Sequence, residues 1–194
     1  MNTRRKIRFS VLAGALCAAS YSGVGEAGGA DQGKKQTEAK ARPLSDSEII
    51  AVAETANTGE VAQGKLAEQK ANKPAAKSFA NMMVTEHGDA NEKVEALAKD
   101  LGISPKESAV SDEVKNSGDA VQRKLNQSAP VVFDRVYLET QIAEHQKVLK
   151  TFDERLIPSA KSPKLKSLLG DLRAHVVHHL QVARTSLENL EKTG

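Results

Sequence analysis

The sequence predicts an all-α protein, an antiparallel four-helix bundle with an extra short helix between the second and third long helices. Apolar residues recur at spacings of three and four along four long stretches, as expected for helices with one buried face. Prolines and a glycine mark the ends of these stretches, and no stretch competes as a β-strand. The 194 residues are enough for one domain with a short extension, and too few for two full cores.

The N-terminus has the layout of a secretory signal peptide. Basic residues near the start precede a mostly apolar run over residues 9–20, and small residues follow over 22–30. Because this run is shorter than the ~20 residues that cross a bilayer, we expect residues 1–27 to be removed rather than kept as a membrane anchor. Cleavage after Ala27 is favoured, and Ala18-Ala19-Ser20 offers a competing site. The mature chain is therefore expected in the periplasm or cell envelope.

Removal of the signal changes both the charge and the chemistry of the chain. The whole sequence has a formal net charge of +3, but basic and acidic residues are equal in number after residue 27. The mature chain then has no excess of basic residues that would indicate a surface for nucleic acid, so no nucleic-acid partner is expected. The only cysteine, Cys17, lies within the signal, so a metal site in the mature chain would need imidazole, carboxylate or thioether ligands.

The mature chain is predicted to begin with a leader and then two long helices. Residues 28–45 lack apolar periodicity and are rich in glycine, lysine and polar side chains, which indicates a flexible leader. The predicted bundle domain covers residues 46–192. Its first helix is expected from Asp46 to Ala71, because capping and acidic residues cluster at its start. The second is expected from Pro74 to Leu101, since proline suits a first turn and Gly102 suits a left-handed cap.

The rest of the domain is predicted to add one short helix and two long ones. Residues 103–130 are more polar, and a shorter helix is expected over Ser111–Asn126. The third long helix is expected from Pro130 to about Ile157, and the fourth from Pro163 to about Glu191. The long connection before the third long helix permits one crossover along the bundle, as in ferritin-like proteins, whereas a simple up-down order is equally allowed by length.

Each long helix has one acid or imidazole in its otherwise apolar stripe, near the middle of the helix. These residues are Glu60, His87, His145 and His179. The middles of packed helices meet at the same height whichever way the chain runs, so the four side chains are expected to converge in one central layer. Burial of polar groups costs a few kcal/mol unless they are hydrogen-bonded, so these side chains must satisfy one another or bind something.

Two interpretations of this layer stay open. In the first, the layer is structural, and Glu60 and Gln63 accept hydrogen bonds from the imidazoles. In the second, it is a metal site. The residues predicted as ligands are Glu60, His87, His145, His179 and His175. Imidazole with one or two carboxylates suits zinc, copper, nickel or iron, so the cofactor would be a divalent transition metal whose identity the sequence does not select.

The neighbours of these histidines extend the metal hypothesis. His175 and His179, at i and i+4, project from one face of a helix, a spacing that lets two imidazoles bind one ion. His178 is expected to face solvent. Three further side chains are close enough in the sequence to enlarge a site: Glu86, Gln141 and Glu144.

A glycine-containing run in the first helix imitates a different motif. Residues 59–65 resemble the start of a phosphate-binding loop, but Leu66 replaces the required Ser or Thr and no strand precedes the run. A phosphate site is therefore not expected.

At these residues the chain resembles a bacterial family, domain of unknown function 4142 (DUF4142). The resemblance covers about Asp46 to Leu190 and is carried by a combination of short motifs. They are Gly59-Glu60-Val61 with Leu66-Ala67, the run from Phe79 to His87 with Asn91, Phe133-Asp134 with Tyr137, Gln141 and His145, and Leu180 and Ala183 around His179. The resemblance implies a ferritin-like four-helix fold and an exported or envelope-associated protein, and it brings no known reaction.

The sequence departs from the di-iron proteins of ferritin-like fold. Those proteins take a Glu from two helices and a Glu-x-x-His pair from each of the other two. Val84 and Val176 stand three residues before His87 and His179, so neither pair is present. A di-iron centre that activates oxygen is therefore not expected.

The hypotheses for function follow from these residues. No catalytic signature appears, so a non-enzymatic role is favoured over an enzyme. The first hypothesis is an exported periplasmic or envelope bundle that acts by interaction or in stress protection, through an envelope partner or a second copy of the chain. The alternative is a metal-binding ferritin-like redox protein that uses the central layer of histidines with Glu60.

Overall fold

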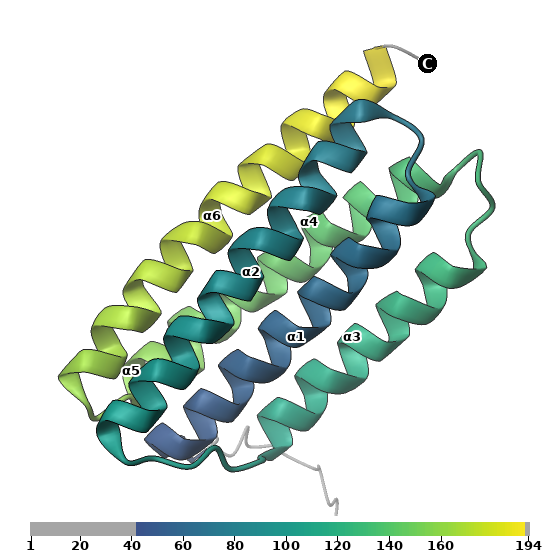
Figure 1. Ribbon diagram of the computed structural model, residues 1–194. Coiled ribbons are helices and arrows are strands. Elements are labelled where there is room, and N and C mark those ends of the chain that lie inside the picture. The colour runs from purple at the N-terminus through teal and green to yellow at the C-terminus, as the bar shows by residue number, and fades with distance from the viewer. Residues whose placement is uncertain (1–41, 193–194) are drawn as a thin grey trace, which may run out of the picture. The chain divides into compact units, whose positions relative to one another are not determined.

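The computed structural model describes residues 42–192 (Figure 1). The predicted signal peptide, and the predicted leader up to residue 41, lie outside the described residues. The helices are, in chain order, α1 (Asp46–Lys70), α2 (Pro74–Leu101), α3 (Ala109–Gln127), α4 (Phe133–Thr151), α5 (Ile157–Ser159) and α6 (Pro163–Lys192), with a π-helix, η1 (Phe152–Leu156), between α4 and α5. No strand occurs within residues 42–192, and the predicted all-α class is confirmed. None of these helices is apolar over a length that could cross a membrane.

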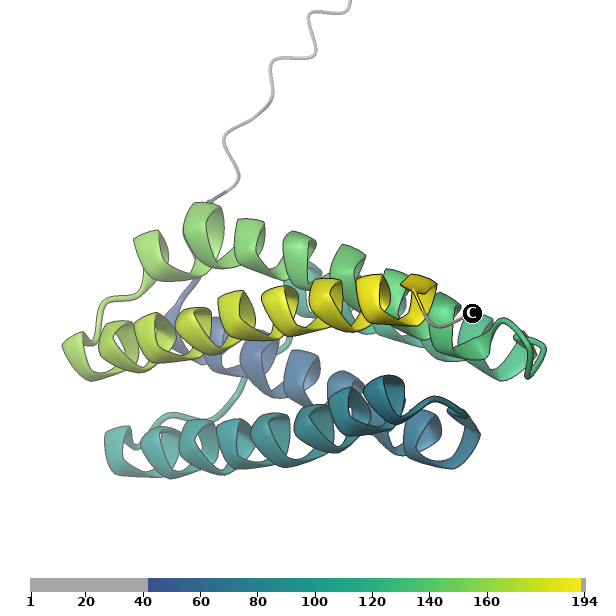
Figure 2. The same ribbon diagram turned by 90° about the horizontal axis from the view of Figure 1, so that it is seen from above.

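The long helices form two antiparallel hairpins that pack against each other. α1 pairs with α2 and α4 pairs with α6, and Figure 2 shows the two pairs as separate layers. α3 runs beside α1 from the end of α2 to the start of α4, so it crosses the length of the bundle (Figure 1). α2 and α4 consequently run in the same direction, which is the crossover order of ferritin-like bundles. α3 has 19 residues, as many as α4, and extends beyond the predicted Ser111–Asn126 at both ends.

Local sequence signals explain where the first two helices begin and end. Ser45 caps α1: its hydroxyl accepts from the Glu48 N–H at 3.3 Å, while the Glu48 carboxylate accepts from the Ser45 N–H at 2.9 Å. Leu44, just before this cap, is buried in the core, and Arg42 pairs with Glu48. Gly102 ends α2 with a φ of 63°, a left-handed conformation that favours glycine.

The third long helix begins later than predicted. It starts at Phe133 rather than Pro130, because residues 128–132 form a bend and a turn before the helix. Val131 lies within the predicted helix, but in this turn it is 92% exposed. The predicted start of this helix was therefore wrong.

The same helix widens into a π turn near its end. In η1 the N–H of Ile157 bonds to the carbonyl of Phe152, five residues back rather than four. The π turn directly precedes Pro158, whose ring would clash with the carbonyl of Glu154 in a regular α-helix. The chain thereby stays helical through α5 and presents Phe152 and Leu156 to the core.

Two hydrophobic clusters fill the bundle on either side of its middle. One gathers the start of α1, the end of α2, η1 and the start of α6. The other gathers the end of α1, the start of α2, the end of α3, the start of α4 and a later part of α6. In the second region α1 and α2 approach closely at Gly64, where a Cβ would lie 2.8 Å from Cγ2 of Val84. The run that imitates a phosphate-binding loop is therefore helical, and its second glycine serves packing.

Two aspartates join the hairpins at opposite ends of the bundle. Asp46, the first residue of α1, accepts from both backbone N–H groups of Lys161-Ser162, at 2.8 and 2.9 Å, in the turn before α6. Asp134, near the start of α4, accepts from both backbone N–H groups of Asn72-Lys73, at 2.9 and 3.1 Å, in the turn between α1 and α2. Each hairpin thus holds a turn at the end of the other hairpin. These contacts at both ends determine how far the helices are shifted along one another, and so which residues meet in the middle of the bundle.

Candidate metal centre

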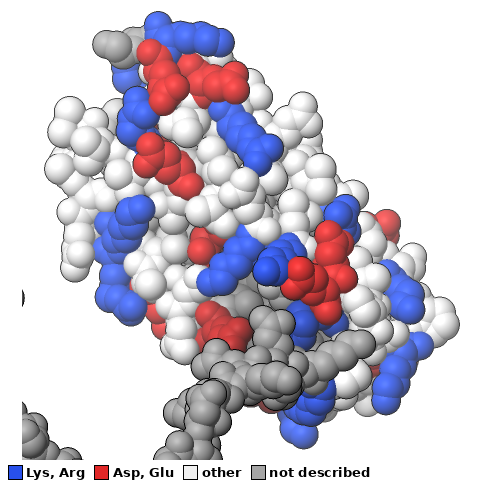
Figure 3. All heavy atoms as spheres, turned by 180° about the vertical axis from the view of Figure 1, so that it is seen from behind, with Lys and Arg blue, Asp and Glu red and all other residues white. Residues whose placement is uncertain are grey.

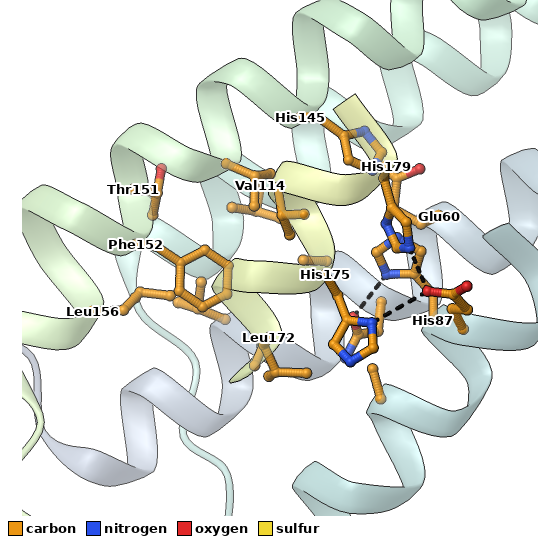
Figure 4. Close-up of a pocket in the computed structure, with 18 residues that line it drawn as sticks. Glu60, His87, Val114, His145, Thr151, Phe152, Leu156, Leu172, His175 and His179 are labelled. Carbon is orange, nitrogen blue, oxygen red and sulfur yellow. Dashed lines mark hydrogen bonds and ion pairs between the residues drawn. The ribbon is translucent and has the colours of Figure 1, made fainter. Parts of the chain in front are cut away.

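Three histidines from three helices meet in a polar layer at the middle of the bundle (Figure 4). His87 comes from α2, His145 from α4 and His179 from α6, and they are 7%, 2% and 1% exposed. Their ring centroids lie 5.9 Å apart for His87 and His145, 5.4 Å for His145 and His179, and 5.0 Å for His87 and His179. One ring nitrogen from each histidine lies within 4.8 Å of the other two. The predicted convergence of these mid-helix histidines is confirmed.

Each of the three imidazoles has one nitrogen engaged by a hydrogen-bond acceptor. Amide, carbonyl and carboxylate oxygens only accept in such contacts, so the engaged nitrogen carries the hydrogen. The other nitrogen of each ring, Nε2 of His87 and His145 and Nδ1 of His179, is buried without a hydrogen-bond partner. The engaged pairs are His87 Nδ1 with Asn57 Oδ1 at 3.0 Å, His145 Nδ1 with the Gln141 carbonyl at 2.9 Å, and His179 Nε2 with Glu86 Oε2 at 2.8 Å.

Burial keeps these rings neutral. It lowers the pKa of His145 and of His179 to about 4, and it lowers the pKa of His87 well below its ordinary value. Repulsion from the neighbouring imidazoles adds to the effect at His87, whereas the hydrogen bond to Glu86 opposes it at His179. At neutral pH each unpartnered nitrogen therefore has a free lone pair, the form in which imidazole binds a metal.

The spacing of the rings fits a single metal ion. Around a tetrahedral ion with metal–nitrogen bonds of ~2.0–2.1 Å, the centroids of imidazole ligands lie roughly 5 Å apart. The observed separations of 5.0, 5.4 and 5.9 Å are close to this value. An acceptor behind each ring is also the arrangement that orients metal-binding histidines. Three protein ligands leave the fourth tetrahedral position open.

Glu60 and Gln63 lie in the same layer, but neither accepts a hydrogen bond from the three imidazoles. Gln141 instead donates to Oε1 of Gln63 at 2.7 Å and also bonds to Glu60. Burial raises the pKa of Glu60 to about 7, against the effect of Gln141, and Oε2 of Glu60 has no hydrogen-bond partner. The hydrogen bonds expected of a purely structural layer are therefore not formed among these residues.

A second group of side chains with ligand atoms lies beside the first and shares His179 with it. Oε2 of Glu86 accepts from Nε2 of His179 at 2.8 Å and from Nδ1 of His175 at 3.2 Å, and two of the dashed lines in Figure 4, which start at His179 and His175, mark these contacts. The three side chains offer ligand atoms within 4.8 Å of one another. The side chains of Glu86 and His175 are 31% and 50% exposed, so this group opens to solvent. Glu60 belongs to neither group, and His178 is exposed, as predicted.

A cavity of about 50 Å³ adjoins the histidines. Its polar end is formed by the three imidazoles and Glu60, and its apolar end includes Phe152, Leu156 and Leu172 (Figure 4). A water-sized ligand needs roughly 10–15 Å³, so the cavity has room for more than one small molecule beside an ion. The π turn contributes two of the apolar wall residues, Phe152 and Leu156.

The comparison with protein families agrees with the sequence motifs. Residues 30–185 match the family described as Domain of unknown function (DUF4142). The chain belongs to this family. No curated protein and no solved structure gives a significant match.

In this DUF4142 protein, the valines that stand in place of the di-iron glutamates serve packing. Val84 on α2 packs against Gly64 of α1, and Val176 on α6 lines the cavity. The three buried ligands that meet are all imidazoles, whereas a ferritin-like di-iron centre is held mainly by carboxylates. The residues of this DUF4142 chain therefore do not fit a di-iron centre.

Sequence reasoning missed Asn57, whose amide oxygen orients His87. The available signal was its position, one turn before Glu60 on the same face of α1. Glu144, considered as an additional ligand, instead accepts from the Ser117 hydroxyl of α3, with both oxygens at 3.1 Å. In this DUF4142 chain Glu144 therefore joins the crossover helix to the bundle, and it belongs to neither ligand group.

Proposed function

We propose that this protein is an exported helical bundle that binds one divalent transition-metal ion through His87, His145 and His179. The observation that carries the proposal is the hydrogen bonding of the rings: each imidazole has one nitrogen bonded to an oxygen acceptor and its other nitrogen buried without a partner. A buried acceptor without a partner costs ~1–3 kcal/mol, and a single ion would satisfy all three at once.

The charges around the layer support a cation there. Three neutral imidazoles leave the charge of a divalent ion uncompensated, and two carboxylates are close by. Glu86 bonds to the outer nitrogen of His179, and Glu60 lines the same cavity. A cation would favour the ionised form of Glu60, whose pKa burial raises to about 7 in the metal-free site. Together the two carboxylates would balance the charge of the ion.

The donor set narrows the choice of metal. Imidazole nitrogens suit zinc, copper, nickel or iron, whereas calcium and magnesium prefer oxygen ligands. We propose metal binding and no di-iron reaction, because the site has no Glu-x-x-His pair.

The proposal of export rests on the signal-like layout of residues 1–27. N-terminal sequencing of the native protein would give a chain that begins after this segment, and a native chain that still begins at Met1 would refute export. On the face in Figure 3, basic and acidic side chains are interspersed and do not gather by sign, so this face gives the interaction hypothesis no comparable support.

A metal titration tests the proposed function. The mature chain is purified with a chelator, freed from it, and titrated separately with Zn²⁺, Cu²⁺, Ni²⁺ and Fe²⁺ in a calorimeter. Zn²⁺ is expected to bind with a stoichiometry of one per chain and to raise the melting temperature. If none of the four ions binds stoichiometrically or raises the melting temperature, the layer is structural and the proposed metal function is wrong.

A further inference from the structure

His179 belongs to both groups of ligand atoms, and its two nitrogens serve different groups. Nε2 bonds to Glu86, which also accepts from His175, and these three residues define the outer site. Nδ1 is the buried, unpaired nitrogen, and it defines the inner site together with His87 and His145. The ring of His179 is therefore shared by a site that reaches solvent and a site that does not.

We propose that the outer site is the loading position for the metal, from which the ion passes to the inner site. This inference rests on the proposed function of the inner site. Two imidazoles and a carboxylate form a suitable set of ligands for a transition metal. His175 and His179 lie one turn apart on α6 and can turn toward one ion.

Differences in exposure support this direction of transfer. The side chains of Glu86 and His175 are 31% and 50% exposed, whereas His87 and His145 are 7% and 2% exposed. A hydrated ion can therefore meet the outer site without any movement of the helices. His179, itself 1% exposed, is the ligand common to both sites, and it releases the ion from one ring nitrogen before it binds the ion through the other.

A neutral His179 can serve only one of the two sites at a time. A neutral imidazole has one hydrogen and one lone pair. With an ion on Nε2, the hydrogen is on Nδ1 and faces the inner site. With the ion on Nδ1, the hydrogen is on Nε2 and is donated to Glu86, which is the contact seen at 2.8 Å. Inward transfer of the ion therefore moves one hydrogen from Nδ1 to Nε2, with no net gain or loss of protons, and each chain holds one ion.

The kinetics of Co²⁺ binding test this inference. Co²⁺ absorbs visible light in tetrahedral sites, so stopped-flow mixing with metal-free protein follows occupation of the inner site. His175→Ala is compared with wild type and with His178→Ala, a matched control that removes an exposed imidazole from the same helix. His175→Ala is expected to slow association and release by about 10- to 100-fold. The dissociation constant at equilibrium should change by less than about threefold, because the route does not alter the bound state. His178→Ala should behave as wild type.

Each other outcome has a definite meaning. Equal association rates in wild type and His175→Ala, with binding intact, would overturn the loading role and leave the proposed function standing. A wild type that binds no Co²⁺ would overturn both. Loss of binding at equilibrium in His175→Ala would show that the outer site holds the resident ion, and two ions per wild-type chain would show that the sites fill independently. Either result would overturn transfer through His179.

Discussion

Nδ1 of His145 donates a hydrogen bond to the backbone carbonyl of Gln141, one turn earlier in α4, at 2.9 Å. Because no side-chain substitution removes a main-chain carbonyl, the orientation of this ring is built into the helix. The rings of His87 and His179 are oriented by side chains instead, Asn57 and Glu86. The inner site therefore has one ligand fixed by the backbone and two that can be changed through their partners.

The inner histidines are predicted to carry all of the stabilisation by metal. In wild type, Zn²⁺ at about 100 times its dissociation constant should add ~2.7 kcal/mol to the free energy of unfolding. His87→Ala, His145→Ala and His179→Ala should each abolish this gain, measured by thermal unfolding with and without Zn²⁺. His178→Ala should keep it, because that ring is exposed and belongs to neither site. A gain that survives His145→Ala would place the ion elsewhere.

The amide of Asn57 is predicted to tune the affinity for metal without binding the ion. Asn57→Ala removes the acceptor that orients His87. We expect a Zn²⁺ affinity weaker by about 10- to 100-fold, as is typical when a hydrogen-bond partner of a metal-binding histidine is removed. Asn57→Asp keeps an acceptor in place and should recover most of the affinity. Competition with a chromophoric chelator measures both variants. Equal loss in Asn57→Ala and Asn57→Asp would contradict the orienting role.

The buried carboxyl of Glu60 is predicted to make metal-free protein less stable at high pH. Its pKa in the folded chain is about 7, above the ordinary value of 4.5. As the pH rises, the unfolded chain therefore loses this proton at a lower pH than the folded chain does. The stability gained from this proton is fully present below pH 4.5 and is lost as the pH rises through 7. The effect of Glu60→Gln on the free energy of unfolding, relative to wild type, should therefore be more stabilising at pH 8.5 than at pH 4, by about 2–3 kcal/mol.

Urea unfolding at the two pH values measures this difference. Glu113→Gln, at an exposed position, controls for the removal of one surface charge. If Glu60→Gln shifted the free energy of unfolding equally at both pH values, burial would not govern the ionisation of Glu60.

The close contact between α1 and α2 predicts opposite effects at two glycines of one helix. Gly64→Ala would place a Cβ 2.8 Å from Cγ2 of Val84 and 3.2 Å from the carbonyl of Ala80, so we expect a loss of ~1–3 kcal/mol. At Gly59 a Cβ meets nothing within 4 Å, and Gly59→Ala should stabilise the helix by up to ~1 kcal/mol. Chemical denaturation of both variants tests this, and a stabilising Gly64→Ala would mean that the helices separate at little cost.

The central layer could be predicted because it depends on two properties that can be taken from residue spacing in the sequence. Periodicity indicates which face of a helix is buried, and distance from the helix ends indicates the height in the bundle. These placed His87, His145 and His179 together. Spacing does not indicate which neighbour a side chain turns toward within a layer. Glu60 therefore shares the layer, yet it bonds to Gln141 instead of joining either ligand group.

Other features depend on contacts between segments far apart in the sequence. The length of the connection before α4 allowed two helix orders, and the packing of α3 along α1 decides between them. Pro158 alone would predict that the helix simply ends before it, whereas the structure has a π turn there. Phe152 and Leu156 of this π turn are buried in the core.

The place of His179 in the last helix has a consequence for how the protein acquires its ion. A growing or translocating chain presents His87 and His145 well before α6 follows, and the turn before α6 is secured by Asp46 at the start of α1. A nascent chain therefore lacks the third ligand until almost all of it has emerged. If the chain is unfolded during the export that we propose, the ion is acquired only at the destination. The metal supply of that compartment, together with ligand chemistry, would then decide which ion the protein carries.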